Sequence, residues 1–210
     1  MRNVFLTLLM VLCYHSIRAQ DFKFGAIGGY NHCAPSANNR KPGFHVGAKG
    51  ELSLTKQGDL YLEFEAIYSA QKWEHWGFKY NGANVDGTTI NHAFTPAYLQ
   101  VPIRLGYKMP VSNEVKLFVN AGPYANIGLH GKNKVTEYTA GVIESSSEEN
   151  AFGDKGLERF DVGLGVRVGV EFLNHIQLSG GYDYGLVKTD NIHHFGNKNR
   201  TWTLSAAYIF

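Results

Sequence analysis

Apolar and polar residues alternate along eight stretches of the chain. The last, TWTLSAAYIF at 201–210, places Trp202, Leu204, Ala206, Tyr208 and Phe210 on one face, with mainly threonine and serine between them. A period of two is typical of a β-strand with one apolar face. The stretches span 22–31, 43–54, 60–70, 97–108, 116–130, 158–172, 175–187 and 201–210. They predict an all-β fold of eight strands, most of them reaching the roughly 9 to 11 residues of a tilted transmembrane strand.

The connections between these stretches alternate between short and long. Short links fall at 55–58, 109–114 and 173–174, and long ones at 32–42, 72–94, 131–157 and 189–198. This order predicts an antiparallel up-and-down transmembrane β-barrel with short periplasmic turns and long extracellular loops, in which the last strand pairs with the first. We expect the long loops to be polar, and deletion of 140–152 to leave the barrel intact.

Two kinds of barrel fit this alternation. In a soluble, lipocalin-like ligand-binding barrel the apolar face lines the interior, whereas in a membrane barrel it meets lipid. The aromatic residues of the apolar face favour the membrane barrel, because they gather at the two ends of a band of aliphatic and small residues. They are Phe22, Tyr107, Phe172, Tyr208 and Phe210 at the short-turn end and Tyr30, Tyr68, Phe160, Tyr184 and Trp202 at the long-loop end.

The polar face carries charges of both signs from several strands. An eight-stranded lumen is only wide enough to be filled by side chains, so these charges are expected to pair across it and to close it. The predicted lumen charge network consists of Lys49, Glu51, Glu63, Glu65, Arg104, Arg167, Glu171 and Asp183. Lys108, Arg159 and Asp161 lie on the same face. A closed lumen predicts that the barrel does not conduct ions.

The first residues, MRNVFLTLLMVLCYHSIRAQ, have the features of a secretory signal peptide. Arg2 is followed by an apolar run too short to span a bilayer as a helix, and the small residue Ala19 precedes the expected cleavage. We expect a signal peptide at 1–19 and one barrel domain at 20–210. Loss of Arg2 and Arg18 leaves 18 basic residues, which balance the 18 acidic ones. Nothing in this balance indicates a nucleic-acid partner.

Several motifs resemble the PorT-type outer-membrane β-barrel proteins of Bacteroidota. They include YLQVPIRLGYK (98–108), AGPYANIGLHGK (121–132), DVGLGVRVGVEF (161–172) and KNRTWTLSAAYIF (198–210). The resemblance implies an eight-stranded barrel in the cell outer membrane. Tyr208 and Phe210 resemble the terminal signal by which the barrel-assembly machinery recognises such proteins. Pro102 and Pro123 lie within these motifs, and we expect a β-bulge at each because proline removes a ladder donor.

The candidate chemistry lies in the long loops. His32, His75, His92, His193 and His194 could assemble a metal site or an acid/base pair, and His193 with His194 is the best candidate. Their spacing matches no strong zinc motif, and no cofactor is predicted. The leading hypothesis is a non-enzymatic outer-membrane barrel whose outer loops contact an envelope protein in adhesion or as a secretion accessory. The alternatives are the soluble ligand-binding barrel and a membrane-embedded hydrolase that uses the loop histidines.

Overall fold

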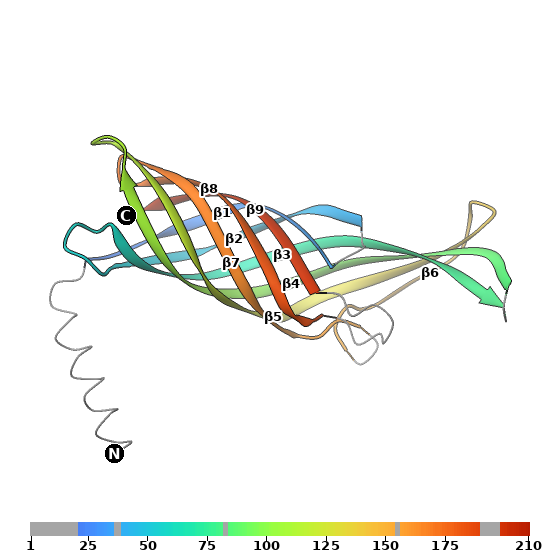
Figure 1. Ribbon diagram of the computed structural model, residues 1–210. Coiled ribbons are helices and arrows are strands. Elements are labelled where there is room, and N and C mark those ends of the chain that lie inside the picture. The colour runs from blue at the N-terminus through green and yellow to red at the C-terminus, as the bar shows by residue number, and fades with distance from the viewer. Residues whose placement is uncertain (1–20, 36–38, 82–83, 154–155, 190–197) are drawn as a thin grey trace, which may run out of the picture.

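The computed structural model describes residues 21–210 except 36–38, 82–83, 154–155 and 190–197. Every regular element in this part of the chain is a β-strand (Figure 1). The strands are β1 (Phe22–Pro35), β2 (Asn39–Ser53), β3 (Leu60–Asn81), β4 (Asn84–Pro110), β5 (Val115–Thr139), β6 (Val142–Asn150), β7 (Phe160–Phe172), β8 (Ile176–Lys188) and β9 (Lys198–Ile209). The described residues contain no helix long and apolar enough to cross a membrane. The predicted signal peptide lies outside the described residues.

Eight of the nine strands form a closed antiparallel ring. Its order is β1, β2, β3, β4, β5, β7, β8 and β9, and β9 closes it against β1, with Tyr30 opposite Leu204. The short turns lie at one end of the ring, together with the carboxyl terminus (Figure 1). The turn between β7 and β8 is the tightest of these, and Leu173 and Asn174 adopt positive φ angles there. The predicted eight-stranded up-and-down barrel is confirmed.

The two faces of the ring differ sharply in polarity. Glu63 and Arg104 are 0 % and 1 % exposed inside the ring, whereas Ile103 and Leu105, the chain neighbours of Arg104, are 45 % and 52 % exposed outside it. The outward face also carries the predicted aromatics at both ends, including Phe22 and Tyr208 at one and Tyr30 at the other. A soluble ligand-binding barrel would need these apolar side chains to line a cavity. That alternative is therefore wrong.

The ninth strand belongs to an arm that projects beyond the ring. Residues 75–81 of β3, 84–92 of β4, 132–139 of β5 and all of β6 form a four-stranded antiparallel sheet, which we call the arm (Figure 1). At its tip, Ala140 and Gly141 both have positive φ angles and join β5 to β6 in a two-residue hairpin. The expectation of long polar loops at 72–94 and 131–157 is therefore wrong, because most of these residues continue the barrel strands.

The prolines were expected to sit in bulges, and they do not. Around Pro102, Phe64 pairs with Ile103 and Ile67 with Gln100, so the register of β3 and β4 is the same on both sides. Pro123 pairs with Leu164 in an unbroken register between β5 and β7. The irregularity of the β4–β5 pair lies instead at Ala97 and Tyr98, below the arm. The prolines are accommodated without an inserted residue.

Candidate functional site

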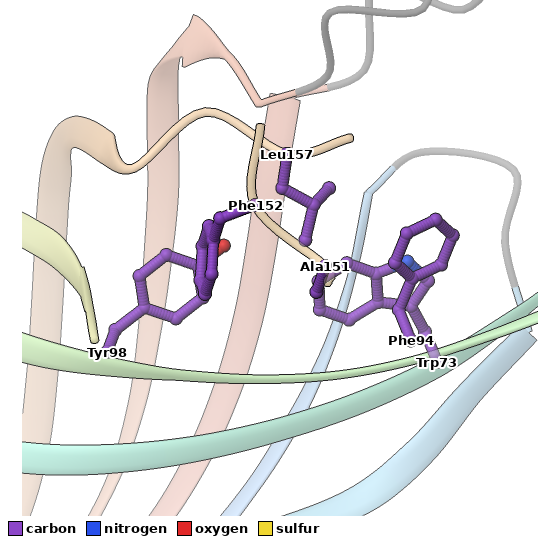
Figure 2. Close-up of a cluster of buried hydrophobic side chains, with 6 residues drawn as sticks. All are labelled: Trp73, Phe94, Tyr98, Ala151, Phe152 and Leu157. Atoms are coloured by element: carbon purple, nitrogen blue, oxygen red, sulfur yellow. The ribbon is translucent and has the colours of Figure 1, made fainter. Parts of the chain in front are cut away.

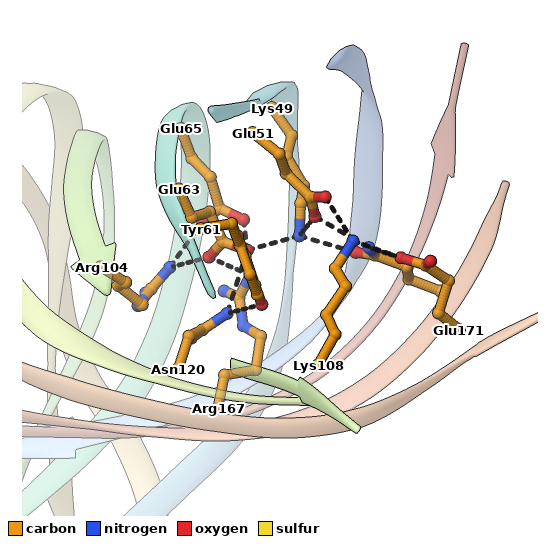
Figure 3. A network of polar contacts seen from close by, with 11 residues as sticks. Lys49, Glu51, Tyr61, Glu63, Glu65, Arg104, Lys108, Asn120, Arg167 and Glu171 are labelled. Carbon is orange, nitrogen blue, oxygen red and sulfur yellow. Dashed lines mark hydrogen bonds and ion pairs between the residues drawn. The ribbon is translucent and has the colours of Figure 1, made fainter. Parts of the chain in front are cut away.

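A network of buried ion pairs and hydrogen bonds fills the half of the lumen nearer the short turns (Figure 3). Strand alternation points its side chains inward, and the register sets Glu63 opposite both Glu51 on β2 and Arg104 on β4. Two carboxylates directly opposite each other would repel. Lys49 relieves this repulsion: its Nζ lies 2.5 Å from Glu63 Oε2 and 3.3 Å from Glu51 Oε1.

Two guanidinium groups complete the middle of the network. Arg104 Nη1 lies 2.8 Å from Glu65 Oε2 and 3.2 Å from Glu63 Oε1. Arg167 Nη1 approaches the other oxygen of Glu65 at 2.6 Å. Arg104 Nη2 also lies 3.6 Å from Asp183 Oδ1 on β8. The two arginines therefore connect β3, β4, β7 and β8 across the lumen.

A second cluster lies closer to the short turns. Lys108 Nζ lies 2.5 Å from Glu51 Oε2 and also binds Glu171 Oε2. Gln177 donates from Nε2 to Glu51 at 2.8 Å and to Glu171 at 2.7 Å, and its Oε1 accepts a bond from Lys49 Nζ. Gln177 therefore joins the second cluster to the first, and the two form one network.

The structure brings all eight residues of the predicted network together. Among the described residues, the network holds four buried cationic side chains and five carboxylates, because Lys108 also belongs to it. The sequence placed Lys108 on the polar face but not in the network, and Gln177 was missed because a neutral amide gives no charge signal. Removing one partner of such buried pairs leaves an uncompensated charge, at a typical cost of about 3–5 kcal/mol.

The short-turn end of the lumen opens into a polar hollow. Its volume is about 130 Å³, and the network residues Glu51, Lys108 and Glu171 lie at its wall. Lys23, Lys56 and Lys116 line it nearer the turns. Lys116 Nζ lies 3.7 Å from Glu171 Oε1. The network therefore closes the inner end of this hollow.

The outer half of the lumen is polar but mostly uncharged. Asn31 donates to the hydroxyl of Ser69, and His45 hydrogen-bonds to the hydroxyl of Ser205 at 3.0 Å. The buried Cys33 thiol donates to Asn199 Oδ1 at 2.8 Å. The main charged group here is Asp161, which accepts a bond from Asn126. Hydrogen bonds between neutral groups therefore replace the ion pairs of the other half.

An apolar cluster lies at the outer end of the lumen (Figure 2). Trp73, Phe94 and Tyr98 face inward from β3 and β4, and the chain after β6 folds back over them. We call the described residues of this returning segment, Ala151–Gly153 and Gly156–Leu157, the cap. Phe152 packs edge-on against the Tyr98 ring at a centroid distance of 5.4 Å. Ala151, Phe152 and Leu157 are all buried.

A backbone hydrogen bond attaches the cap to the ring, because Ala151 N donates to Gly131 O on β5 at 3.0 Å. Within the cap, Leu157 N donates to Ala151 O at 2.7 Å. Gly128 is required beside it, because a Cβ there would lie 2.5 Å from the Phe152 ring. Deletion of 140–152 would remove β6 together with Ala151 and Phe152. The expectation that this deletion removes only a polar loop is therefore wrong.

The histidines of the described residues do not gather into one site. His75 and His92 lie opposite each other on the arm, whereas His32 is exposed near the end of β1. His193 and His194, the best candidates in the sequence, lie outside the described residues. Among the described residues, no group of three or more histidine, cysteine, aspartate or glutamate side chains is placed to hold a metal ion.

Comparison with known proteins places the chain in a family. The model of the outer membrane protein beta-barrel domain matches residues 16–191. The chain belongs to this family. Its members are outer-membrane proteins, and the closed ring with a polar interior is the corresponding architecture. Comparison with curated protein sequences gives no match.

Several solved structures of outer-membrane proteins are similar to this family member. Neisserial surface protein A is 17% identical, with 90% of this chain and 97% of that chain covered and a TM-score of 0.47. OprG from Pseudomonas aeruginosa is 12% identical, with 91% of this chain and 97% of that chain covered and a TM-score of 0.45. Ail, the attachment invasion locus protein of Yersinia pestis, solved with the heparin analogue sucrose octasulfate, is 16% identical, with 91% and 97% covered and a TM-score of 0.37.

Proposed function

We propose that this protein is a non-enzymatic outer-membrane scaffold that holds the arm outside the cell for contact with an envelope partner. The ring contacts outer-membrane lipid through its apolar face, and its lumen is closed. The observation that carries the proposal is the joint placement of network and cap, which fill the interior and leave the arm as the largest projecting element of the described residues (Figure 1).

The arm exposes aromatic side chains, as a protein interaction surface does. Trp76 and Phe78 on its outer face are 47 % and 60 % exposed, and the Trp76 ring packs against Tyr138 at a centroid distance of 5.7 Å. Exposed aromatic residues are typical of interaction surfaces. Pairing across β3, β4, β5 and β6 fixes the backbone from which these rings project.

The finer assignment is to a PorT-like component of the cell envelope in Bacteroidota, in adhesion or as an accessory of secretion. Its support is the set of sequence motifs that resemble that family. We further propose that the barrel-assembly machinery recognises the terminal pair Tyr208 and Phe210. Both are exposed, and the Phe210 ring packs against Tyr208 and Phe24 at the closing seam of the ring.

Photocrosslinking in intact cells tests the scaffold proposal. A benzophenone amino acid replaces Trp76 on the arm in one strain and the exposed Lys56 in the short turn after β2 in another. We expect a discrete protein adduct from position 76 that the variant at position 56 does not give. Absence of any adduct from position 76, in protein that is folded in the outer membrane, would contradict the proposal.

A further inference from the structure

The arm ends in a strand with an unpaired edge. Within the described residues, β6 pairs with β5 and stands last in the order of the sheet. All nine of its residues are exposed. Unpaired N–H and C=O groups along such an edge are a template for a further strand. Proline and lysine, which often protect natural edges, are absent from β6.

The side chains of β6 change in character along its length. Val142 and Ile143 at the tip of the arm are 67 % and 59 % exposed. Glu144 and three serines follow, and Glu148 and Glu149 lie at the base. Glu148 already has a partner, because Lys132 Nζ lies 2.7 Å from its Oε2, but both side chains are more than half exposed. An exposed pair of this kind is weak, so a partner cation can share Glu148.

Pairing of two copies of β6 is disfavoured by their charges. An antiparallel pair centred on Ser146 sets Glu144 of one copy opposite Glu148 of the other, and sets Ile143 opposite Glu149. A parallel pair in register sets every glutamate against its own copy. Like charges directly opposite each other destabilise a sheet. The occupant of this edge must therefore carry positive charge where β6 carries negative charge.

We propose that β6 accepts an extended segment of a partner protein as a further antiparallel strand. Basic residues at the amino-terminal end of that segment face Glu148 and Glu149, and apolar residues at its carboxyl-terminal end face Val142 and Ile143. Main-chain hydrogen bonds supply the affinity and the charge gradient sets the direction. This inference rests on the proposed function, because it names the class of partner that the arm contacts.

Synthetic nine-residue peptides test the direction of binding on the purified full-length protein in detergent. The probe has lysines at its second and third positions, threonines in its centre, and isoleucine and valine at its end. Its matched control is the same sequence reversed. A third peptide is the probe methylated on alternate backbone nitrogens, which cannot pair along the edge. We expect the probe to bind at least about tenfold more tightly than the reversed peptide and the methylated peptide not to bind.

The protein variants separate charge from general loss of structure. The double substitution Glu148→Gln with Glu149→Gln should weaken binding of the probe peptide several-fold and reduce the salt dependence of that binding. The control, Glu114→Gln with Glu158→Gln, removes two exposed carboxylates away from the edge and should leave binding unchanged. Equal affinity for probe and reversed peptide, binding of the methylated peptide, or no binding at concentrations on the order of 1 mM would overturn the inference.

Two further results distinguish this inference from the proposal on which it rests. If a partner crosslinks at position 76 but the peptide test fails, strand addition at β6 is ruled out and the scaffold function is still supported. Self-association of the purified protein that is blocked by substitutions in β6 would show that a second copy takes the edge, and would also overturn the inference.

Discussion

The two halves of the lumen are closed by different means. In the half nearer the short turns, ion pairs join side chains that are fixed on the strands of the ring, from Lys49 on β2 to Glu171 on β7. In the outer half, neutral hydrogen bonds prevail, and the end is covered by a returning segment that contributes Phe152 and Leu157. The network cannot be removed without disrupting the ring, whereas the cap can detach from the ring alone. The network is therefore a permanent plug of the lumen, and the cap is a separable cover.

The largest effect should come from reversing a charge in the plug. Arg104→Glu removes the cation shared by Glu63, Glu65 and Asp183 and adds a further carboxylate among them. We expect a loss of about 3–5 kcal/mol in the free energy of unfolding. Urea unfolding of protein reconstituted in lipid vesicles, followed by the gel shift of the folded barrel, measures this loss.

The control for that change is Lys188→Glu at the exposed end of β8. It makes the same charge reversal at the surface and should change stability by no more than about 0.5 kcal/mol. If Arg104→Glu is as stable as the parent, water rather than protein solvates the plug, and the contrast between the two halves is lost.

The second largest effect concerns the cover, and it should remain local. Phe152→Ala removes the ring that packs on Tyr98, and truncation of a buried phenylalanine typically costs about 3–5 kcal/mol. Because the cap is attached to the ring by few backbone bonds, this cost should appear as opening of the cap and not as unfolding of the barrel.

Cys33 reports this opening, because it is the free cysteine of the described residues and is fully buried. Its reaction with a maleimide should be slow in the parent and at least about tenfold faster in Phe152→Ala. Ile143→Ala, an exposed truncation on the neighbouring β6, serves as the control and should not change the rate. An unchanged rate in Phe152→Ala would show that the cap does not cover this part of the lumen.

The smallest effect is a pH dependence confined to the arm. Burial and the neighbouring His75 lower the pKa of His92, while a hydrogen bond between His92 and Asn133 and the charge of Glu149 oppose this shift. A lowered pKa means that the folded arm disfavours the protonated ring. Its contribution to stability is complete above the ordinary histidine pKa of about 6.5 and is lost as pH falls below that value.

Hydrogen exchange measures this pH effect. After correction for the intrinsic rate, amides of the arm should be less protected at pH 5 than at pH 7, whereas those of the ring should not change. His92→Gln should abolish the difference. A uniform response of arm and ring would contradict a local origin at His92.

The alternation of residues was enough to predict the ring and much of the plug. Inward charges such as Glu63 and Arg104 are identified because side chains alternate between the two faces of a strand, and a narrow lumen requires these charges to pair. Alternation does not show which uncharged inward side chains hydrogen-bond to the charged ones, so Gln177 was missed. The arm was mistaken for loops because apolar residues such as Trp76 and Phe78 lie among polar stretches without the regular alternation of the ring strands. In addition, its tip has Ala140 and Gly141 rather than the usual Asn-Gly turn. Phe152 and Leu157, apolar residues in a polar segment, were the available signal for the cap.

The conductance of the wild-type protein in a planar lipid bilayer tests the closed lumen most directly. Because the network fills one half of the lumen and the cap covers the other end, we predict no sustained ion current, even when Phe152→Ala has loosened the cap. Arg104→Glu, which disrupts the plug itself, is the variant in which current should first appear. Stable single-channel steps from the wild-type protein would contradict the closed scaffold and would identify the barrel as a pore.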